Sequence, residues 1–250
     1  MWRRGAAGEP IRVFRSRRTF LLTVSLSSFA VLAVLVTWYA WPSRETSQPF
    51  PGPRFCCKDM NGDRKADILW RQGSGAVAVW LVSGTSVVGT GRLAPSVQPD
   101  WTIVGVGDFN GDGKADVLWR QTSGLVAVWL MNGTNLIGTG APGTAPADWT
   151  IVGVGDFNGD GKADILWRQS SGTVAVWLLN GAALSGTGLL PGGTLTESTI
   201  MGVGDFNGDG KADILWRQAS GAVAVWLLDG MSVVGTGVLP GKPAREWRVQ

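Results

Sequence analysis

The chain has 250 residues, with 22 Lys and Arg, 19 Asp and Glu, and no His. The absence of histidine excludes Ser-His-Asp and Cys-His catalysis, imidazole metal ligands and histidine pH switches. The first 18 residues hold six arginines and one glutamate, a net +5, so the rest of the chain carries −2 although the whole carries +3. We therefore expect no nucleic-acid partner, because the basic charge is confined to the N-terminal segment.

The N-terminal segment indicates that the protein is exported. Residues 1–18 form a basic tail that we expect in the cytoplasm, and Phe20–Trp41 is a run of 22 residues without a charge. As a helix this run would be about 33 Å long, enough to cross a bilayer, so 19–41 is predicted as a transmembrane anchor or a signal peptide. Ser16–Leu21, with Arg17 and Arg18, is similar to a twin-arginine export signal. An uncleaved anchor and a cleaved signal both stay open. Either places the rest of the chain outside the cytoplasm, anchored in the membrane or secreted.

A short linker follows. Residues 42–53 are polar and contain Pro49, Pro51, Gly52 and Pro53, which favours an extended spacer. The two cysteines of the chain, Cys56 and Cys57, are adjacent, and a bond between neighbours is strained, so no disulfide framework is expected.

From residue 54 to residue 250 the chain repeats itself. Repeats start near 54, 101, 149 and 198, and an acidic loop begins in each at Asp59, Asp108, Asp156 or Asp205, with spacings of 49, 48 and 49 residues. Repeats of this length predict stacked or ringed structural units.

Within a repeat the apolar pattern has a period of two, which predicts strands. In the second repeat we expect strands over 101–106, 116–121, 125–131 and 134–139. Asn132-Gly133 predicts a two-residue hairpin turn with positive φ at both residues.

Four strands in just under 50 residues match one blade of a β-propeller. We therefore predict an all-β fold, a β-propeller of about four four-stranded blades. Glu246–Val249 is similar to the opening strand of a repeat and would either complete the first blade or begin a fifth. If the ring stays open, a partner chain is expected at the exposed edge, with a homo-oligomer as one possibility.

The acidic loop predicts a calcium site. Side-chain oxygens stand at positions 1, 3, 5 and 9 of the nine-residue loop, the backbone carbonyl at position 7 can turn inward, and glycines stand at positions 4 and 6. Oxygen ligands at this spacing suit Ca²⁺. Ordinary turn chemistry is the alternative, because Asp, Asn and Gly are common turn residues.

The expected ligands in the three intact copies are Asp108, Asn110, Asp112, Lys114 (carbonyl) and Asp116; Asp156, Asn158, Asp160, Lys162 and Asp164; and Asp205, Asn207, Asp209, Lys211 and Asp213. A fourth, degraded copy has Asp59, Asn61, Asp63 and Asp67, with Arg64 in place of the second glycine, and is expected to bind weakly or not at all.

The motif Asp-Phe-Asn-Gly-Asp-Gly-Lys-Ala-Asp, followed by Ile-Leu-Trp or Val-Leu-Trp, resembles the FG-GAP/VCBS repeats of integrin α-subunits and of some surface lectins. The resemblance covers residues 55 to 245 and implies a propeller with calcium bound in the hairpin loops. It does not fix a function, since the family includes adhesins, lectins and domains attached to enzymes.

Two further positions repeat. Tryptophans in the second and third strands of each repeat are predicted to lie in the core, with stacking on sugars as the alternative: Trp70, Trp119, Trp167 and Trp216, then Trp80, Trp129, Trp177 and Trp226. Arginine follows each second-strand tryptophan, at Arg71, Arg120, Arg168 and Arg217, and is expected to pair with a carboxylate of its own loop or to lie at the surface.

No catalytic residues are left once the loop carboxylates bind metal, so we expect no enzyme. The expected function is a calcium-stabilised surface for recognising glycan or protein at the cell surface or in the periplasm, in other words adhesion. The alternatives are an assembly module that pairs with other chains and an accessory domain of an extracellular enzyme system.

Overall fold

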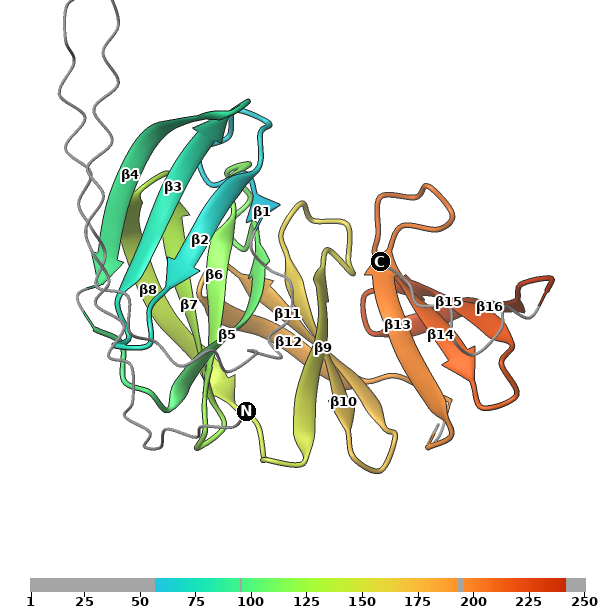
Figure 1. Cartoon of the computed structure of the whole chain (residues 1–250). Coiled ribbons are helices and arrows are strands. Elements are labelled where there is room, and N and C mark those ends of the chain that lie inside the picture. Colours follow the sequence, from blue (N-terminus) through green and yellow to red (C-terminus); the bar gives the residue numbers. More distant parts are fainter. Residues whose placement is uncertain (1–56, 95, 193–195, 242–250) are drawn as a thin grey trace, which may run out of the picture. The chain divides into compact units, whose positions relative to one another are not determined.

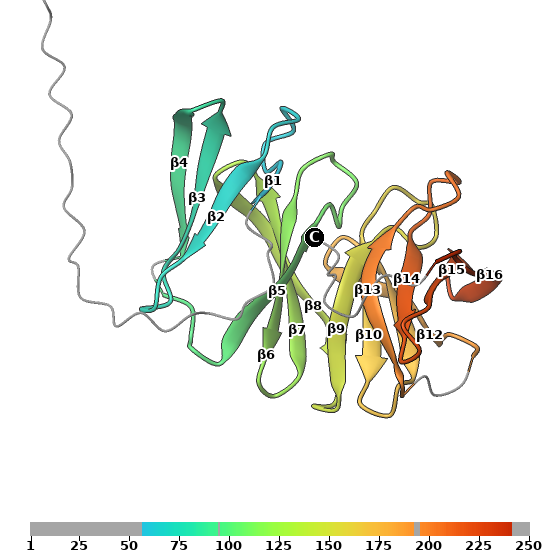
Figure 2. The same cartoon turned by 45° about the vertical axis from the view of Figure 1, so that its right-hand side comes forward.

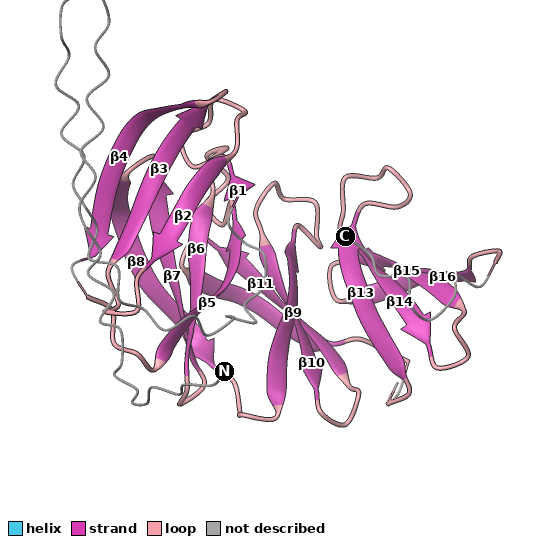
Figure 3. Cartoon of the chain, viewed as in Figure 1, coloured by secondary structure: helices cyan, strands magenta, loops and turns pink. Residues whose placement is uncertain are grey.

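The computed structural model describes residues 57–94, 96–192 and 196–241, and this part of the chain is all β. Figure 3 shows strands joined by loops throughout these residues. The predicted tail, transmembrane segment and linker, the cysteine at 56 and the strand predicted at 246–249 lie outside the described residues. Among the residues that are described, no helix has the length and apolar character needed to span a membrane.

Sixteen strands form four antiparallel sheets in the described residues, and each repeat contributes one four-stranded sheet. The first sheet contains β1 (Cys57–Lys58), β2 (Asp67–Arg71), β3 (Val77–Ser83) and β4 (Ser86–Ala94). The second contains β5 (Trp101–Gly107), β6 (Asp116–Gln121), β7 (Leu125–Asn132) and β8 (Asn135–Thr144). The third contains β9 (Trp149–Gly155), β10 (Asp164–Gln169), β11 (Val174–Asn180) and β12 (Ala183–Leu189). The fourth contains β13 (Ser198–Gly204), β14 (Asp213–Gln218), β15 (Val223–Asp229) and β16 (Ser232–Val238).

Strands that are neighbours in sequence are neighbours in every sheet, as in the blades of a propeller. Figures 1 and 2 follow the four sheets in chain order from β1 to β16. The four strands predicted in the second repeat are confirmed. The main difference is β8, which runs to Thr144, five residues beyond the prediction, because its pairing with β7 resumes after each irregularity as far as Leu125.

The hairpin turn differs from the prediction by one residue. Asn132 pairs with Asn135, so the two central residues are Gly133 and Thr134, and only Gly133 has a positive φ, 62°. Glycine at the first central position is typical of a type II′ turn, whereas the predicted type I′ turn needs positive φ at both. The other sheets place Gly84, Gly181 and Gly230 at the same point of the turn, with φ of 61° to 64°.

The core lies between the sheets. Successive side chains on the middle strands point to opposite faces of the sheet, and because these residues are mostly apolar, each sheet has two apolar faces. Three buried clusters result, and each combines side chains from two consecutive sheets. Met60 and Val79 of the first repeat pack with Trp119, Phe109 and Leu118 of the second pack with Trp167, and Phe157 and Leu166 of the third pack with Trp216.

Candidate metal-binding loops

The acidic loop joins the first two strands of every sheet and has the same backbone course in all four copies. In the second sheet the Asp108 carboxylate accepts three loop amides: Oδ1 accepts those of Gly111 and Asp112 at 2.7 and 3.1 Å, and Oδ2 accepts that of Gly113 at 2.7 Å. Asp59, Asp156 and Asp205 hold the corresponding three amides of their own loops. The side chain at position 1 thus curls the loop around itself.

Positions 3 and 5 continue the curl. Asn110 Oδ1 accepts the Asp112 amide at 3.0 Å, and Asp112 Oδ1 accepts the Lys114 amide at 2.9 Å. The path requires left-handed backbone at positions 4 and 6, where Gly111 and Gly113 have φ of 78° and 79°.

The first loop keeps this path without the second glycine. Arg64 occupies position 6 with φ of 63°, and it is the one non-glycine residue with positive φ in the described part of the chain. Its amide still donates to Asp59 Oδ2, at 2.6 Å. The loop conformation is therefore retained at the cost of backbone strain.

A lysine accompanies each loop. Lys114 Nζ lies 3.7 Å from Asp112 Oδ2, and Lys162 Nζ lies 3.8 Å from Asp160 Oδ2. In the first loop Lys65 Nζ lies 3.0 Å from Asp63 Oδ2, and its hydrogen bond lowers the pKa of that carboxyl. In the fourth loop Lys211 instead contacts Asp229 Oδ1 at 2.9 Å. A cation bound at position 5 would compete with these ammonium groups.

The aspartate at position 9 has a structural role that the sequence did not reveal. Asp116 is buried, its Oδ2 accepts the Phe109 amide at 2.9 Å, and its Oδ1 accepts the Met131 amide at 2.7 Å. Backbone pairing of β6 with β7 stops at Val117 and Trp129, so the carboxylate takes the place of the next bond in the ladder. Asp67, Asp164 and Asp213 make the same two bonds.

Burial raises the pKa of Asp116 to about 6 and that of Asp164 to about 7, against the opposing effect of the two amide hydrogen bonds. The neighbouring aspartates at positions 5 and 1 add smaller repulsions that act in the same direction as burial. A bound cation would favour the charged carboxylates and relieve this cost.

The donor chemistry of the loops suits a hard cation, since all four side chains offer oxygen and the glycines allow the curl. Within 57–94, 96–192 and 196–241, however, no three His, Cys, Asp or Glu side chains are grouped closely enough to hold a metal ion. The carboxylates at positions 1 and 9 are instead occupied by amides. Asp108 Oδ1 already accepts two amides, whereas Asp108 Oδ2 and both oxygens of Asp116 accept one each, so these three oxygens keep a lone pair for a metal.

Three of the four repeated arginines contact the following sheet. The Arg120 guanidinium lies over the Trp167 ring of the next sheet, 5.1 Å from its centroid, and donates to the carbonyls of Trp149 and Pro146. Arg71 lies over Trp119 at 5.3 Å and Arg168 over Trp216 at 5.6 Å in the same way. For these three arginines the prediction of an own-loop carboxylate is wrong, because the guanidinium reaches across to the following sheet.

For the sheets that follow another sheet, the core prediction is confirmed for the second-strand tryptophans, and the third-strand ones, Trp129, Trp177 and Trp226, are partly buried against the same clusters. Trp119, Trp167 and Trp216 are each 1% exposed and contact the third-strand tryptophan of their own sheet at 4.8 to 5.0 Å between ring centroids. Trp70 and Trp80 of the first sheet, in contrast, are 45% and 38% exposed. Their sequence context is the same, so the difference comes from the neighbouring sheet: among the described residues, no sheet precedes the first one.

Four similar antiparallel sheets with a conserved loop frame define a propeller-like β-repeat protein. The chain belongs to the FG-GAP-like repeat family, whose model matches residues 59–119, 108–167 and 156–216. No curated protein matches the sequence. Among solved structures, a chain of the Photorhabdus luminescens Tc holotoxin pore is 16% identical with a TM-score of 0.38, and the alignment covers 79% of this chain and 12% of that one.

Proposed function

We propose that this chain is an exported, calcium-stabilised repeat domain that presents a surface for recognition of glycan or protein. The observation that carries the proposal is the fourfold loop frame, in which oxygen side chains at positions 1, 3, 5 and 9 are built in the same way in each sheet. Three of the loops, those beginning at Asp108, Asp156 and Asp205, also have both glycines. Catalysis is no part of the proposal.

Calcium would stabilise the fold by linking strands within each sheet. The loop joins the first two strands of a sheet, and its position-9 aspartate also holds the third strand, so a cation there ties three strands together. Extracellular calcium modules bind at roughly 0.1–1 mM, so about 1 mM free calcium would stabilise the fold by about 1.4 kcal/mol per site at the tighter end. Three sites would add about 4 kcal/mol, a large part of the stability of an ordinary domain.

A row of exposed apolar side chains supports a recognition surface. Val88, Ile137 and Val234 occupy the same position of the first, second and fourth repeats, just after the hairpin turn, and are 61%, 56% and 60% exposed. The turn itself lies beside the acidic loop of the preceding sheet, because Gly133 donates to the Met60 carbonyl at 2.7 Å. Exposed apolar side chains that form a contiguous patch mark a contact surface for a partner, and we propose that these three positions contribute to one.

The metal is tested by thermal unfolding of the purified chain in 1 mM calcium and in chelator. We expect calcium to raise the melting temperature of the wild type and Asp112→Ala to lose about a third of that rise, since one of three sites is removed. Asp63→Ala in the first loop is the matched control and should leave the calcium effect nearly intact. Equal melting temperatures in calcium and chelator for the wild type would refute the proposal that calcium stabilises the fold.

Recognition is tested by glycan-array binding in calcium and in chelator, followed by the triple variant Val88→Asp, Ile137→Asp and Val234→Asp. We expect binding in calcium that the triple variant abolishes without changing the melting temperature. Mass spectrometry of the N-terminus of the mature protein separates the membrane-anchored form, which keeps residues 20–41, from the secreted form.

The second candidate function is assembly with other chains. One observation favours it. In the first and fourth sheets, one face is exposed although the same face is buried in other sheets: Trp70 is 45% exposed and Phe206 is 48% exposed.

A further inference from the structure

The interface between consecutive sheets is built from the same backbone bonds three times. Between the second and third sheets, the Ala163 amide donates to the Asp108 carbonyl at 2.6 Å and the Gly181 amide donates to the Phe109 carbonyl at 2.8 Å. The other two interfaces repeat both bonds at 2.5 to 2.7 Å: Ala115 to Asp59, Gly133 to Met60, Ala212 to Asp156 and Gly230 to Phe157. Every interface thus has an acceptor face on the earlier sheet and a donor face on the later one.

Side chains on the two faces fit closely. The residue at position 2 of the acceptor loop is buried beneath the donor face, with Phe109 and Phe157 at 0% exposure and Met60 at 1%. Glycines on the first strand of the acceptor sheet allow this approach: a Cβ added to Gly153 would lie 2.4 Å from a methyl of Val203. The fit depends on absent side chains on one face and small or apolar ones on the other.

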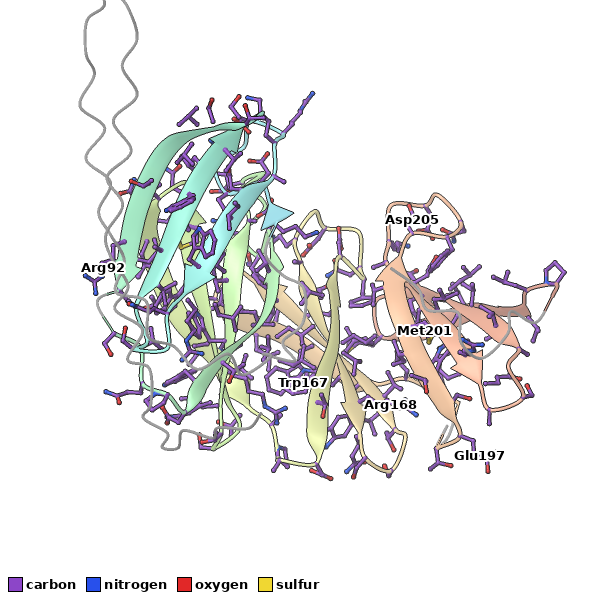
Figure 4. All side chains as sticks on the ribbon, in the orientation of Figure 1. Arg92, Trp167, Arg168, Glu197, Met201 and Asp205 are labelled. Atoms are coloured by element: carbon purple, nitrogen blue, oxygen red, sulfur yellow. The ribbon has the colours of Figure 1, made fainter. Side chains whose placement is uncertain are left out.

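The acceptor face of the fourth sheet is exposed, and no other sheet of the described residues packs on it. Phe206 is 48% exposed, and a Cβ added to Gly202 would meet no atom within 4 Å. Beside β13 and β14 lies a hollow of about 670 Å³, lined by Glu197, Ile200, Met201 and Gln218 among others. Figure 4 shows Asp205 and Glu197 near the two ends of β13, with Met201 between them.

The donor face of the first sheet is likewise exposed in the part of the chain that the structure describes. Ala66 is exposed although Ala115, Ala163 and Ala212 are 6% to 8% exposed, and Trp70 is 45% exposed. Within the described residues, the amides of Ala66 and Gly84 and the carbonyls of Asp205 and Phe206 take no part in the bonds that their equivalents form. The described part of the chain therefore carries both halves of an interface like the other three, one half at each end.

From these matched halves we infer that two copies of this chain associate head to tail, the acceptor face of one on the donor face of the other. The inference rests on the assembly function above and names its partner. In the contact, Ala66 and Gly84 of one copy donate to the carbonyls of Asp205 and Phe206 of the other, and Phe206 packs beneath the first sheet. A second copy is the occupant because both faces are exposed in the described part of the chain, and each has the residues that the other face contacts at the three interfaces.

The pairing can close. An interface between two different surfaces forms a ring when its rotation closes and a filament when it does not. The described residues of two copies would bring together eight sheets, within the four to eight blades that propellers contain. Each copy would then bury the exposed faces of its first and fourth sheets.

The test is the mass of the full chain and of two variants, measured by sedimentation in density-matched detergent. The wild type should have twice the 26.4 kDa of one chain before any processing. Phe206→Asp and Trp70→Asp should each sediment as monomers, and an equal mixture of the two should regain the doubled mass, because one intact acceptor face meets one intact donor face. Association through residues 20–41 would persist in every variant and so would not produce this pattern.

The control is Val234→Asp, which should leave the doubled mass unchanged. The equivalent residue Ile137 is 56% exposed in the second sheet, which has a neighbour on each side, so this position lies outside both faces. Far-UV circular dichroism of each variant checks that the sheets are retained, and Trp70→Gln with Phe206→Gln is a milder second pair. A monomeric wild type, doubled mass in either single Asp variant, or a mixture that stays monomeric would each overturn the inference. Each sample is measured in calcium and in chelator, so a failure of pairing is distinguished from a failure of the metal loops.

Discussion

The third sheet and the first sheet carry nearly the same residues and differ in what covers them. Trp167 is 1% exposed between Arg120 and Trp177, whereas Trp70, at the same position of the first repeat, is 45% exposed. The two tryptophans have the same strand, the same following arginine and the same third-strand partner. In this protein, burial is a property of a pair of sheets and cannot be assigned to a repeat by itself.

The largest expected effect separates the two sheets directly. Trp167→Ala should destabilise the fold by about 4 kcal/mol, because it removes a fully buried indole and leaves a cavity between two sheets. Trp70→Ala should cost about 1 kcal/mol under conditions where the chain is monomeric, since its ring is already half in water. Urea unfolding followed by circular dichroism measures both. Equal losses would mean that the first sheet is covered in solution.

Replacing the aspartate at position 9 should cause a smaller loss of stability, and the loss should be the same in both sheets, because this aspartate links strands within one sheet. Asp164→Asn keeps the size of the side chain but turns an NH₂ group toward one of the two amides that the carboxylate holds. The unsatisfied amide should cost about 2 kcal/mol. Asp67→Asn is the matched variant in the first sheet and should lose a similar amount.

Both aspartate variants are measured by urea unfolding in chelator, where no calcium contributes. If either loses stability only when calcium is present, then the aspartate acts as a metal ligand rather than as the link between strands that the hydrogen bonds indicate.

The smallest expected effect is a gain of stability from a substitution in the first loop. Arg64→Gly should stabilise the chain by about 1 kcal/mol, because glycine adopts the left-handed φ of 63° without steric cost. Gly113→Ala, at the same position of the second loop, should destabilise by about 1 kcal/mol for the same reason. Differential scanning calorimetry in chelator measures both. A loss of stability in Arg64→Gly would show that the arginine side chain contributes more than its backbone costs.

Much of the fold could be predicted because it is local. Alternating apolar residues define the strands, and the spacing of Asp108, Asp156 and Asp205 defines the repeat. The family membership follows from the same loop. The turn at Gly133 was misplaced by one residue because asparagine before glycine is common to both hairpin types, and only the pairing of Asn132 with Asn135 distinguishes them.

The chemistry of the candidate site was only partly predictable. The curl around Asp108 follows from the acidic and glycine spacing, and the calcium that it suggests is still a prediction. The second role of Asp116 was not visible, because the amide of Met131 that it binds lies 15 residues away in the next hairpin. A hydrogen bond of that kind leaves no signature beyond a buried acidic position.

The four strands of a repeat, its acidic loop and the order in which they are joined can be read from the sequence, because each depends on residues within one repeat. The burial of the repeated tryptophans, the contacts of Arg71, Arg120 and Arg168, and the exposed faces of the first and fourth sheets in the described residues could be learned only from the folded structure. These properties arise at contacts between repeats, where a side chain is enclosed when a second sheet packs on it and otherwise meets water.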